Sequence, residues 1–311
     1  MRISTNVGIG IDRPKSVAEI IAEVQQAADL GLGGAWWAER LTADPLTAAV
    51  VAGLAVPGLP LGTAVVTTYP RHPLALASQA LTVQAATGNR LTLGIGPGHQ
   101  RQVEAALGTK FDRPARHTHE YLSALIPLLR GEPVEFHGEI HHVSGQIQTP
   151  GALPPSVLLA ALGPVMLRTA GELADGTVTA WTGVRTVASH IVPRITAAAQ
   201  AAGRPAPRVV ANLPIAVTAD PDGARTWIAE HFGASGSVAS YRAMFDLEGV
   251  NGGADVVVVG DEGRIEEELR RFAEAGATEF IAVPFGSDEQ IKRTLRVLGA
   301  LNQAAADGGY G

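Results

Sequence analysis

Short apolar runs alternate along the chain with segments of helical periodicity. Strand-like runs lie at 3–9, 34–38, 60–67, 91–95, 157–161, 176–181, 208–217 and 278–284. Helical patterns lie between and after them, among them 73–86, 115–130, 164–174, 185–202, 224–231, 262–275 and 287–303. Strands that are regularly followed by helices favour parallel pairing, because a parallel neighbour requires a crossover connection.

The first helix carries a clear start and stop. Ser16 and Glu19 have the spacing of a capping box, in which both side chains satisfy free amides at a helix N-terminus. Apolar residues then repeat on one face from Val17 to Ala28, and Gly31 is typical of a helix end. The first strand and this helix therefore form one strand–helix unit.

Eight strand-like runs in 311 residues predict a (β/α)8 TIM barrel, formed by residues 1–311 as a single domain. The runs at 158–162 and 280–283 are continuously apolar, as expected for strands that are buried on both faces. An open doubly wound sheet is the alternative, because it shows the same alternation.

Two segments interrupt the repeat and are expected to be insertions, one after the fourth strand and one before the last. The first, at about 131–150, alternates from Val134 to Val143 around Gly138, which predicts a hairpin. The second, at about 233–261, contains a ninth apolar run at 256–259.

Composition excludes several classes of function. The 24 basic and 30 acidic residues give a net charge of -6, which argues against a nucleic-acid-binding protein. The absence of cysteine excludes disulfides, thiolate nucleophiles, zinc–thiolate sites and iron–sulfur clusters. The N-terminus has no signal-like apolar region, and no run is long enough to span a membrane, so a cytoplasmic protein is expected.

Motifs for metal binding and hydrolysis are missing. His117 with His119, and His141 with His142, lack an acidic partner at a convincing spacing, so no metal site is predicted. The chain contains neither a GxSxG elbow nor an HExxH motif, and its glycines match neither the GxGxxG fingerprint nor a P-loop.

In a TIM barrel the functional residues follow the C-terminal ends of the strands. The second strand is followed by Glu39 and Arg40, which are either a charged pair at the mouth or an ordinary surface ion pair. The third is followed by Thr67 and Thr68, whose hydroxyls suit a flat heteroaromatic ligand but also fit a threonine-rich strand end.

The fourth strand has the most unusual exit, with Gly96, Pro97, Gly98 and His99 in succession. Glycines at a strand exit let backbone amides approach an anion or a ring closely. His99 adds a group that titrates near neutral pH. A tight structural turn is the alternative interpretation, although such a turn needs fewer special residues.

The fifth strand ends in Ala161, Leu162, Gly163 and Pro164. A glycine before a proline at the first helical position leaves the amides of the first turn open, and such a terminus attracts phosphate. A plain strand-to-helix turn is equally compatible with these residues.

Several segments spread over nearly the whole chain carry a family resemblance. They are Gly62–Val65 with Arg71–Pro73, Leu93–His99, Leu162–Pro164 with Ala170–Gly176, Gly131–Val134 with His137–Glu139, and Phe272–Ala277. Together they resemble the luciferase-like monooxygenase superfamily, and within it the oxidoreductases that use the deazaflavin coenzyme F420.

This resemblance implies a TIM barrel that binds coenzyme F420, or FMN as the alternative, with the ring over the mouth. It also implies a cis peptide between Ala64 and Val65, and a phosphate held by amides of 96–98 and 161–164. The implied cofactor-binding positions are Glu39, Ala64, Val65, Thr67, Gly96, Pro97, Gly98, His99, Ala161, Leu162, Gly163 and Pro164.

The reaction implied by the resemblance is hydride transfer between the deazaflavin and a small organic substrate. His99 is the first candidate for a catalytic proton donor or acceptor and Glu39 the second. His99 stands where some relatives carry a carboxylate, and Arg40 replaces the histidine of the sugar-phosphate dehydrogenases in this group, which argues against that substrate.

Three other functions remain open. They are an FMN-dependent monooxygenase, a non-catalytic F420 carrier, and a non-redox barrel such as a lyase or isomerase. The expected partners are a small-molecule substrate and a second copy of the chain in a homodimer.

Overall fold

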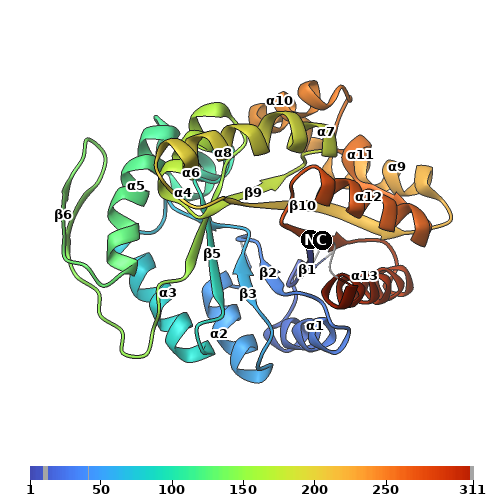
Figure 1. The fold of residues 1–311 in the computed structure, drawn as a ribbon, viewed down its shortest axis with the longest axis horizontal. Coiled ribbons are helices and arrows are strands. Elements are labelled where there is room, and N and C mark those ends of the chain that lie inside the picture. The colour runs from blue at the N-terminus through green and yellow to red at the C-terminus, as the bar shows by residue number, and fades with distance from the viewer. Residues whose placement is uncertain (10–12, 41, 309–311) are drawn as a thin grey trace.

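Eight parallel strands close into a barrel in the computed structural model, which describes residues 1–9, 13–40 and 42–308 (Figure 1). In barrel order they are β1 (Arg2–Asn6), β2 (Ala35–Trp37), β3 (Leu61–Thr63), β5 (Leu91–Gly96), β8 (Ser156–Ala160), β9 (Gly176–Ala180), β10 (Arg208–Val217) and β12 (Glu279–Pro284). Because β9 pairs with β10 and β12 pairs with β1, the ring is complete. The predicted (β/α)8 barrel is confirmed, and an open sheet is excluded.

Helices surround the barrel (Figure 1). They are α1 (Val17–Asp29), α2 (Pro45–Ala55), α3 (Pro73–Thr87), α5 (Pro114–Leu129), α6 (Pro164–Leu173), α8 (Val192–Ala201), α12 (Glu262–Glu274) and α13 (Asp288–Gly308). The capping box of Ser16 and Glu19 opens α1 as predicted. No described helix has the length and apolar character needed to cross a bilayer.

The predicted helix at 185–202 is divided in the structure. A short α7 (Val184–Thr186) leads into a π-helical turn (Val187–Ile191) before α8 begins. Pro193 has no amide hydrogen and its ring crowds the carbonyl four residues earlier, which accounts for the widened turn.

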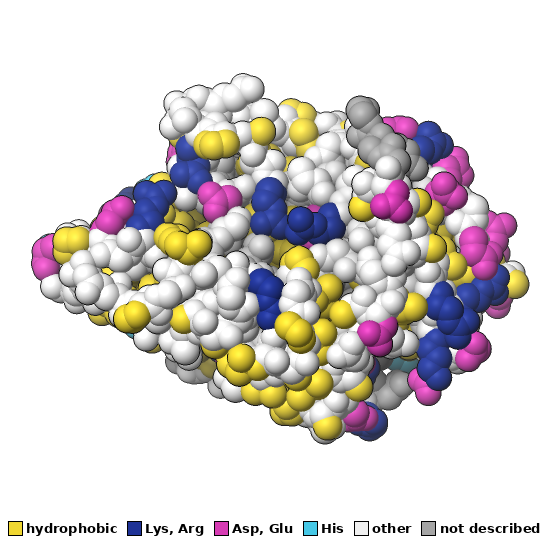
Figure 2. All heavy atoms as spheres, turned by 60° about the horizontal axis from the view of Figure 1, so that its bottom comes forward, with side chains coloured by type: hydrophobic (Ala, Val, Ile, Leu, Met, Phe, Trp, Pro, Cys, Tyr) yellow, Lys and Arg dark blue, Asp and Glu magenta, His cyan; other side chains and the backbone are white. Residues whose placement is uncertain are grey.

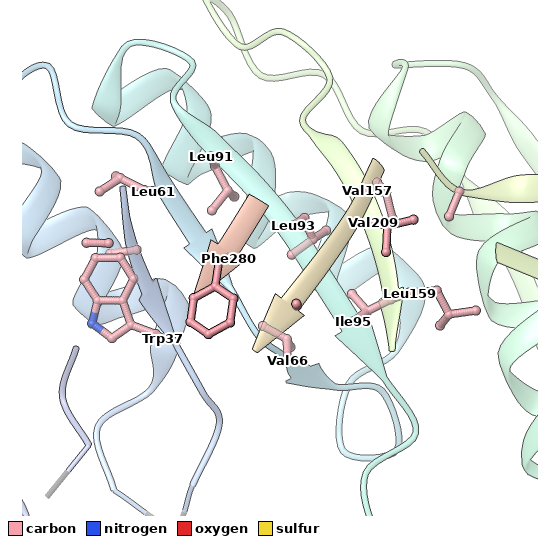
Figure 3. Packing of buried hydrophobic residues seen from close by; sticks show 14 of the residues in the cluster. Trp37, Leu61, Val66, Leu91, Leu93, Ile95, Val157, Leu159, Val209 and Phe280 are labelled. Carbon is pink, nitrogen blue, oxygen red and sulfur yellow. The ribbon is translucent and has the colours of Figure 1, made fainter. Parts of the chain in front are cut away.

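Two apolar layers hold the barrel together. Outward-facing strand side chains pack against the helices, and Figure 3 shows several of them, including Leu93, Leu159 and Phe280. A smaller cluster fills the barrel itself, with Trp36, Leu158, Val178, Val210 and Ile281 from five different strands. Side chains on a strand alternate between these two layers.

The N-terminal end of the barrel is closed by a polar network around Glu279, which is 3% exposed. Its carboxylate accepts hydrogen bonds from Ser4 Oγ at 2.6 Å and Trp36 Nε1 at 2.9 Å, and it pairs with Arg208 at 3.0 Å. The Arg208 guanidinium also donates to Thr92 and Ser156, both at 3.2 Å. The charges are therefore paired and hydrogen-bonded, as a buried ion pair requires.

Both interrupting segments have structure of their own. Strands β6 (Val134–His137) and β7 (His142–Gly145) form an antiparallel hairpin that lies outside the barrel (Figure 1). The ninth apolar run forms β11 (Val258–Gly260), which pairs in parallel with the end of β10. Between β10 and β11 lie α9 (Pro221–Phe232), a 3-10 turn (Gly233–Ser237), α10 (Ala239–Glu248) and α11 (Gly253–Val256).

Candidate active site

The two glycine-containing strand exits lie side by side at the C-terminal end of the barrel. Strands β5 and β8 pair from Thr92 to Ile95, so the segments after Gly96 and Ala160 leave adjacent positions. A Cβ atom at Gly96 would lie 3.0 Å from the Cβ of Ala160. The structure thus brings together the turns at 96–99 and 161–164.

Each of these turns leads to a helix without a side-chain cap. After β5, α4 (Gln100–Leu107) has His99 as its N-cap, and after β8, α6 has Gly163; neither cap makes a side-chain hydrogen bond. The four first amides of a helix need partners outside the helix, and such termini favour anions. A Cβ atom at Gly163 would meet nothing within 4 Å, so this turn borders open space.

The predicted third strand is interrupted by a bulge. It consists of β3 and the short β4 (Val66–Thr67), with a cis peptide between Ala64 and Val65, as the resemblance implied. A Cβ atom at Gly94 would lie 1.9 Å from the Thr63 carbonyl oxygen, and one at Gly96 would lie 3.0 Å from Val65 Cγ2. Gly94 and Gly96 are therefore required by the chain's own bulge, which explains part of the glycine-rich signal.

The remaining predicted cofactor positions differ in exposure. Ala64 and Val65 are half-buried and pack toward the barrel interior, and Leu162 and Gly163 are also half-buried. Ala161 is 1% exposed and its side chain belongs to the outer layer, so only its backbone can reach a ligand. Pro97 and Gly98 are half-buried at the rim, and Pro164 is exposed.

Glu39 is engaged by other parts of the chain. Its carboxylate accepts a hydrogen bond from the Thr67 backbone amide and pairs with Arg71, whose Nη1 lies 2.6 and 2.8 Å from the two oxygens. Arg71 also binds Asp44 at 2.6 Å. This arrangement favours a role for Glu39 in holding β4 in place rather than in moving a proton.

His99 lies exposed at the rim and contacts the long insertion. Its Nε2 atom lies 3.3 Å from the Tyr241 hydroxyl, and the two rings meet edge to face. Desolvation lowers the pKa of His99 below its ordinary value and raises the pKa of Tyr241 to about 12. At neutral pH His99 can therefore accept a proton, and Tyr241 remains a neutral hydroxyl.

Sequence reasoning missed the groups that hold the β8 exit in place. His190 Nε2 lies 2.8 Å from the Leu162 carbonyl oxygen, and the Thr177 hydroxyl donates to the carbonyls of Leu159 and Ala161 at 2.9 and 3.1 Å. Both groups lie within regular elements, so only their tertiary contacts identify them. Sequence reasoning also missed Asn6, because its burial depends on closure of the barrel.

The buried His117 and the half-buried His141 lie between the barrel and the hairpin. His117, which is 4% exposed, lies 2.9 Å from the Thr68 hydroxyl through Nε2 and 3.2 Å from His141 Nε2 through Nδ1. The Glu120 carboxylate accepts hydrogen bonds from the backbone amides of the hairpin turn at residues 139–141. Among the described residues, no group of three or more histidine, aspartate or glutamate side chains could hold a metal ion.

This histidine pair predicts a loss of stability in mild acid. Burial, followed by the nearby His141, lowers the pKa of His117 to about 4. In the unfolded chain His117 binds a proton below pH about 6.5, whereas in the folded protein it stays unprotonated until the pH nears 4. The free energy of unfolding should therefore fall by about 2–3 kcal/mol as the pH drops through this window.

Urea unfolding of the wild type at pH 7 and pH 4.5 measures this loss. The His117→Gln variant, which has no imidazole to protonate, should show a smaller pH dependence. The exposed His119 on the same helix supplies the matched control, and His119→Gln should behave like the wild type. Equal pH dependence in all three proteins would exclude His117 as the source.

The chain is similar in sequence to known proteins. A family model described as luciferase-like monooxygenase matches residues 1–296. The 5,10-methylenetetrahydromethanopterin reductase of Methanolobus tindarius is 29% identical over 195 residues, covering 60% of this chain and 57% of that protein. The enzyme of the same name from Methanopyrus kandleri is 27% identical over 211 residues, covering 62% and 59%. The match thus spans less than two thirds of these relatives' length.

Solved structures resemble the fold over almost its full length. The coenzyme F420-dependent tetrahydromethanopterin reductase of Methanopyrus kandleri aligns with a TM-score of 0.76 at 21% identity, covering 96% of this chain and 98% of that one. The EDTA monooxygenase of a Chelativorans species aligns with a TM-score of 0.79 at 15% identity, covering 98% and 93%. At such identities the likeness concerns the fold alone.

Proposed function

Because this chain belongs to the luciferase-like monooxygenase family, we propose that it is an oxidoreductase that uses coenzyme F420 to transfer a hydride to or from a small organic substrate. The observation that carries the proposal is the pair of uncapped helix N-termini, α4 and α6, at adjacent strand exits. Curated relatives include reductases of a methanopterin substrate, and the solved reductase is named as F420-dependent.

The residues present fit a phosphate-bearing flat cofactor. The open backbone at Gly163 and the turn at 96–99 would hold the phosphate, and the bulge at Ala64 and Val65 would lie against the ring. When bound, the deazaflavin supplies the hydride chemistry. The protein contributes orientation and exclusion of water, and His99 would accept or donate the proton that accompanies transfer to the substrate.

Fluorescence titration of the purified protein with F420 and with FMN tests the proposal. We expect F420 to bind more tightly, and the loaded protein to oxidise reduced F420 when enones or imines are added. Tighter binding of FMN, with consumption of oxygen, would identify a flavin-dependent monooxygenase instead. Binding of F420 without turnover of any substrate would identify a carrier, and affinity for neither cofactor would refute the proposal.

We also expect the protein to form a homodimer through α2 and α3. Residues 45–70 and 73–89, which include both helices, contain no Asp, Glu, Lys or Arg. Val51 and Leu54 on α2 are 39% and 62% exposed. Figure 2, which brings the bottom of Figure 1 forward, shows hydrophobic side chains gathered there with few charged ones among them. Such uncharged surfaces favour isologous pairing.

Replacement of Leu54 by glutamate should therefore convert the dimer to a monomer, because pairing would bury a carboxylate without a partner. The mass measured by light scattering after gel filtration checks this. Leu247 is also exposed, at 42%, but lies on α10 outside this face, so Leu247→Glu serves as the control and should leave the mass unchanged. A monomeric wild-type protein would refute the interface.

A further inference from the structure

Two asparagines whose side chains lie toward the C-terminal end of the barrel have buried carboxamide atoms that make no hydrogen bond within the described residues. Asn6, at the end of β1, is 8% exposed, and neither its Nδ2 nor its Oδ1 atom has a partner in the described residues. Asn212, in β10, likewise leaves its Oδ1 atom buried and unpaired. Buried polar groups are nearly always hydrogen-bonded, so these exceptions require an explanation.

The alternation along the strands directs both side chains into the barrel. Ser4 donates a hydrogen bond to Glu279 in the polar network at the N-terminal end of the barrel, and Asn6 is two residues further along the same face of β1. Val210 belongs to the cluster that fills the barrel, and Asn212 is two residues beyond it. Side chains two residues apart share a face of a strand, so both carboxamides lie above the filled part of the barrel.

The pairing register places the two asparagines on either side of one strand. Ser4 of β1 and Asn212 of β10 both pair with Ile281 of β12, so Asn6 lies two residues beyond the position on β1 that is in register with Asn212. The side chain nearest to Asn6 across β2 is Trp36, whose Nε1 atom already donates to Glu279. On the β12 side, Ile281 and Val283 are apolar.

We propose that Asn6 is a positioning and specificity-determining residue that pairs with an amide or imide edge of the bound ligand. A carboxamide donates through Nδ2 and accepts through Oδ1, so it complements a planar group in which a carbonyl stands next to an N–H. The inference rests on the proposed function, because it requires a flat ligand at this mouth. Such an edge belongs both to the pyrimidinedione ring of the cofactor and to lactam or imide substrates.

The cofactor arm of the test compares FMN and F420 with FMN that is methylated at N3, which removes the imide N–H. The wild type should bind the parent rings at least 10-fold more tightly than the methylated one. Asn6→Leu, whose side chain has the same number and branching of heavy atoms, should lose that discrimination while keeping its melting temperature, because it removes unpaired polar atoms. Asn6→Asp retains an acceptor for the N–H but no donor for the carbonyl. Its preference for the parent ring over the methylated ring should therefore lie between those of the wild type and Asn6→Leu.

The substrate arm uses maleimide and N-methylmaleimide, which are activated alkenes with and without the imide N–H. The chain contains no cysteine that these reagents could alkylate. With reduced F420 as the hydride donor, the alkene is reduced to a succinimide and F420 is oxidised. If Asn6 contacts the substrate, the wild type should show a lower KM for maleimide, and Asn6→Leu should show equal KM values.

The proposal is supported if Asn6→Leu no longer distinguishes the N–H ligand from the N-methyl ligand in either arm. The arm that responds shows whether Asn6 contacts the cofactor or the substrate. Equal discrimination by folded wild type and Asn6→Leu in both arms would overturn it, as would a wild type that does not discriminate in either. Binding of F420 or FMN by the wild type keeps the two proposals separable. If neither cofactor binds, the proposed function fails, and with it the premise for Asn6.

Discussion

Replacement of His99 by alanine is expected to lower kcat by about 100-fold or more, while the Kd for F420 changes by less than about threefold. Positioned acid–base groups contribute roughly 100- to 10,000-fold to turnover. The His99 side chain contacts Tyr241 rather than the open amides, so its loss leaves the proposed phosphate-binding amides unchanged. Stopped-flow turnover and fluorescence titration measure the two effects separately.

The exposed His119 on α5 provides the matched control, and His119→Ala should retain wild-type turnover. If His99 acts as a base, the wild-type rate should fall on the acidic side of its lowered pKa, and His99→Ala should lack this limb. Turnover that is unchanged in His99→Ala would remove the residue from the mechanism. A loss of affinity without a loss of kcat would make it a cofactor contact instead.

Introduction of a carboxylate at Gly163 is expected to weaken binding of F420 and FMN by about 100-fold or more. The added side chain fits, because a Cβ atom at this position meets nothing within 4 Å. An aspartate N-cap accepts the first-turn amides of α6 and so competes with a phosphate, which its charge also repels. Two like charges about 4 Å apart repel by roughly 4 kcal/mol near a protein surface, which exceeds the 2.7 kcal/mol of a 100-fold change.

Riboflavin, which lacks the phosphate, should bind Gly163→Asp and the wild type with similar affinity. Gly163→Ala is the matched variant, since it adds a Cβ atom without charge and leaves the amides free. It should bind FMN as the wild type does. Equal loss of FMN and riboflavin binding in Gly163→Asp would show that the site is distorted, and no loss would place the phosphate elsewhere.

The repeat of strands and helices could be predicted from the sequence because it depends on local periodicity. The hairpin also follows from the alternation between Val134 and Val143, and the start of α1 from the spacing of Ser16 and Glu19. These features depend on neighbours within one turn or one strand. Their physical basis is the direction in which successive side chains point.

The environment of the candidate residues could not be predicted in the same way, because it depends on contacts between distant segments. Glu39 pairs with Arg71, and His99 meets Tyr241, which is 142 positions away in the sequence. The glycine-rich exit predicts a surface for ligands, whereas Gly94 and Gly96 also accommodate the bulge. Sequence alone shows that a glycine is present but not which atoms approach it.

The burial of Asn6 could not be predicted from the sequence either. A polar residue at a strand end is usually solvated, so its position gives no sign of burial. Only the closed barrel shows that the carboxamide is buried and has no partner in the part of the chain that the structure describes. The uncharged surface of α2 and α3, by contrast, can be recognised in the sequence once the helices are placed, because residues 45–70 and 73–89 contain no Asp, Glu, Lys or Arg.

The polar network that closes the N-terminal end of the barrel has a kinetic consequence. Because Glu279 pairs with Arg208 and binds Trp36 at this end, we expect ligands to enter and leave the barrel only at its C-terminal end. The ligand that binds deeper in the barrel must then bind first and dissociate last. Binding should therefore follow a compulsory order, with the proposed redox cofactor before the substrate. Excess substrate that binds before the cofactor would then block cofactor binding, and the reaction velocity should decline at high substrate concentrations.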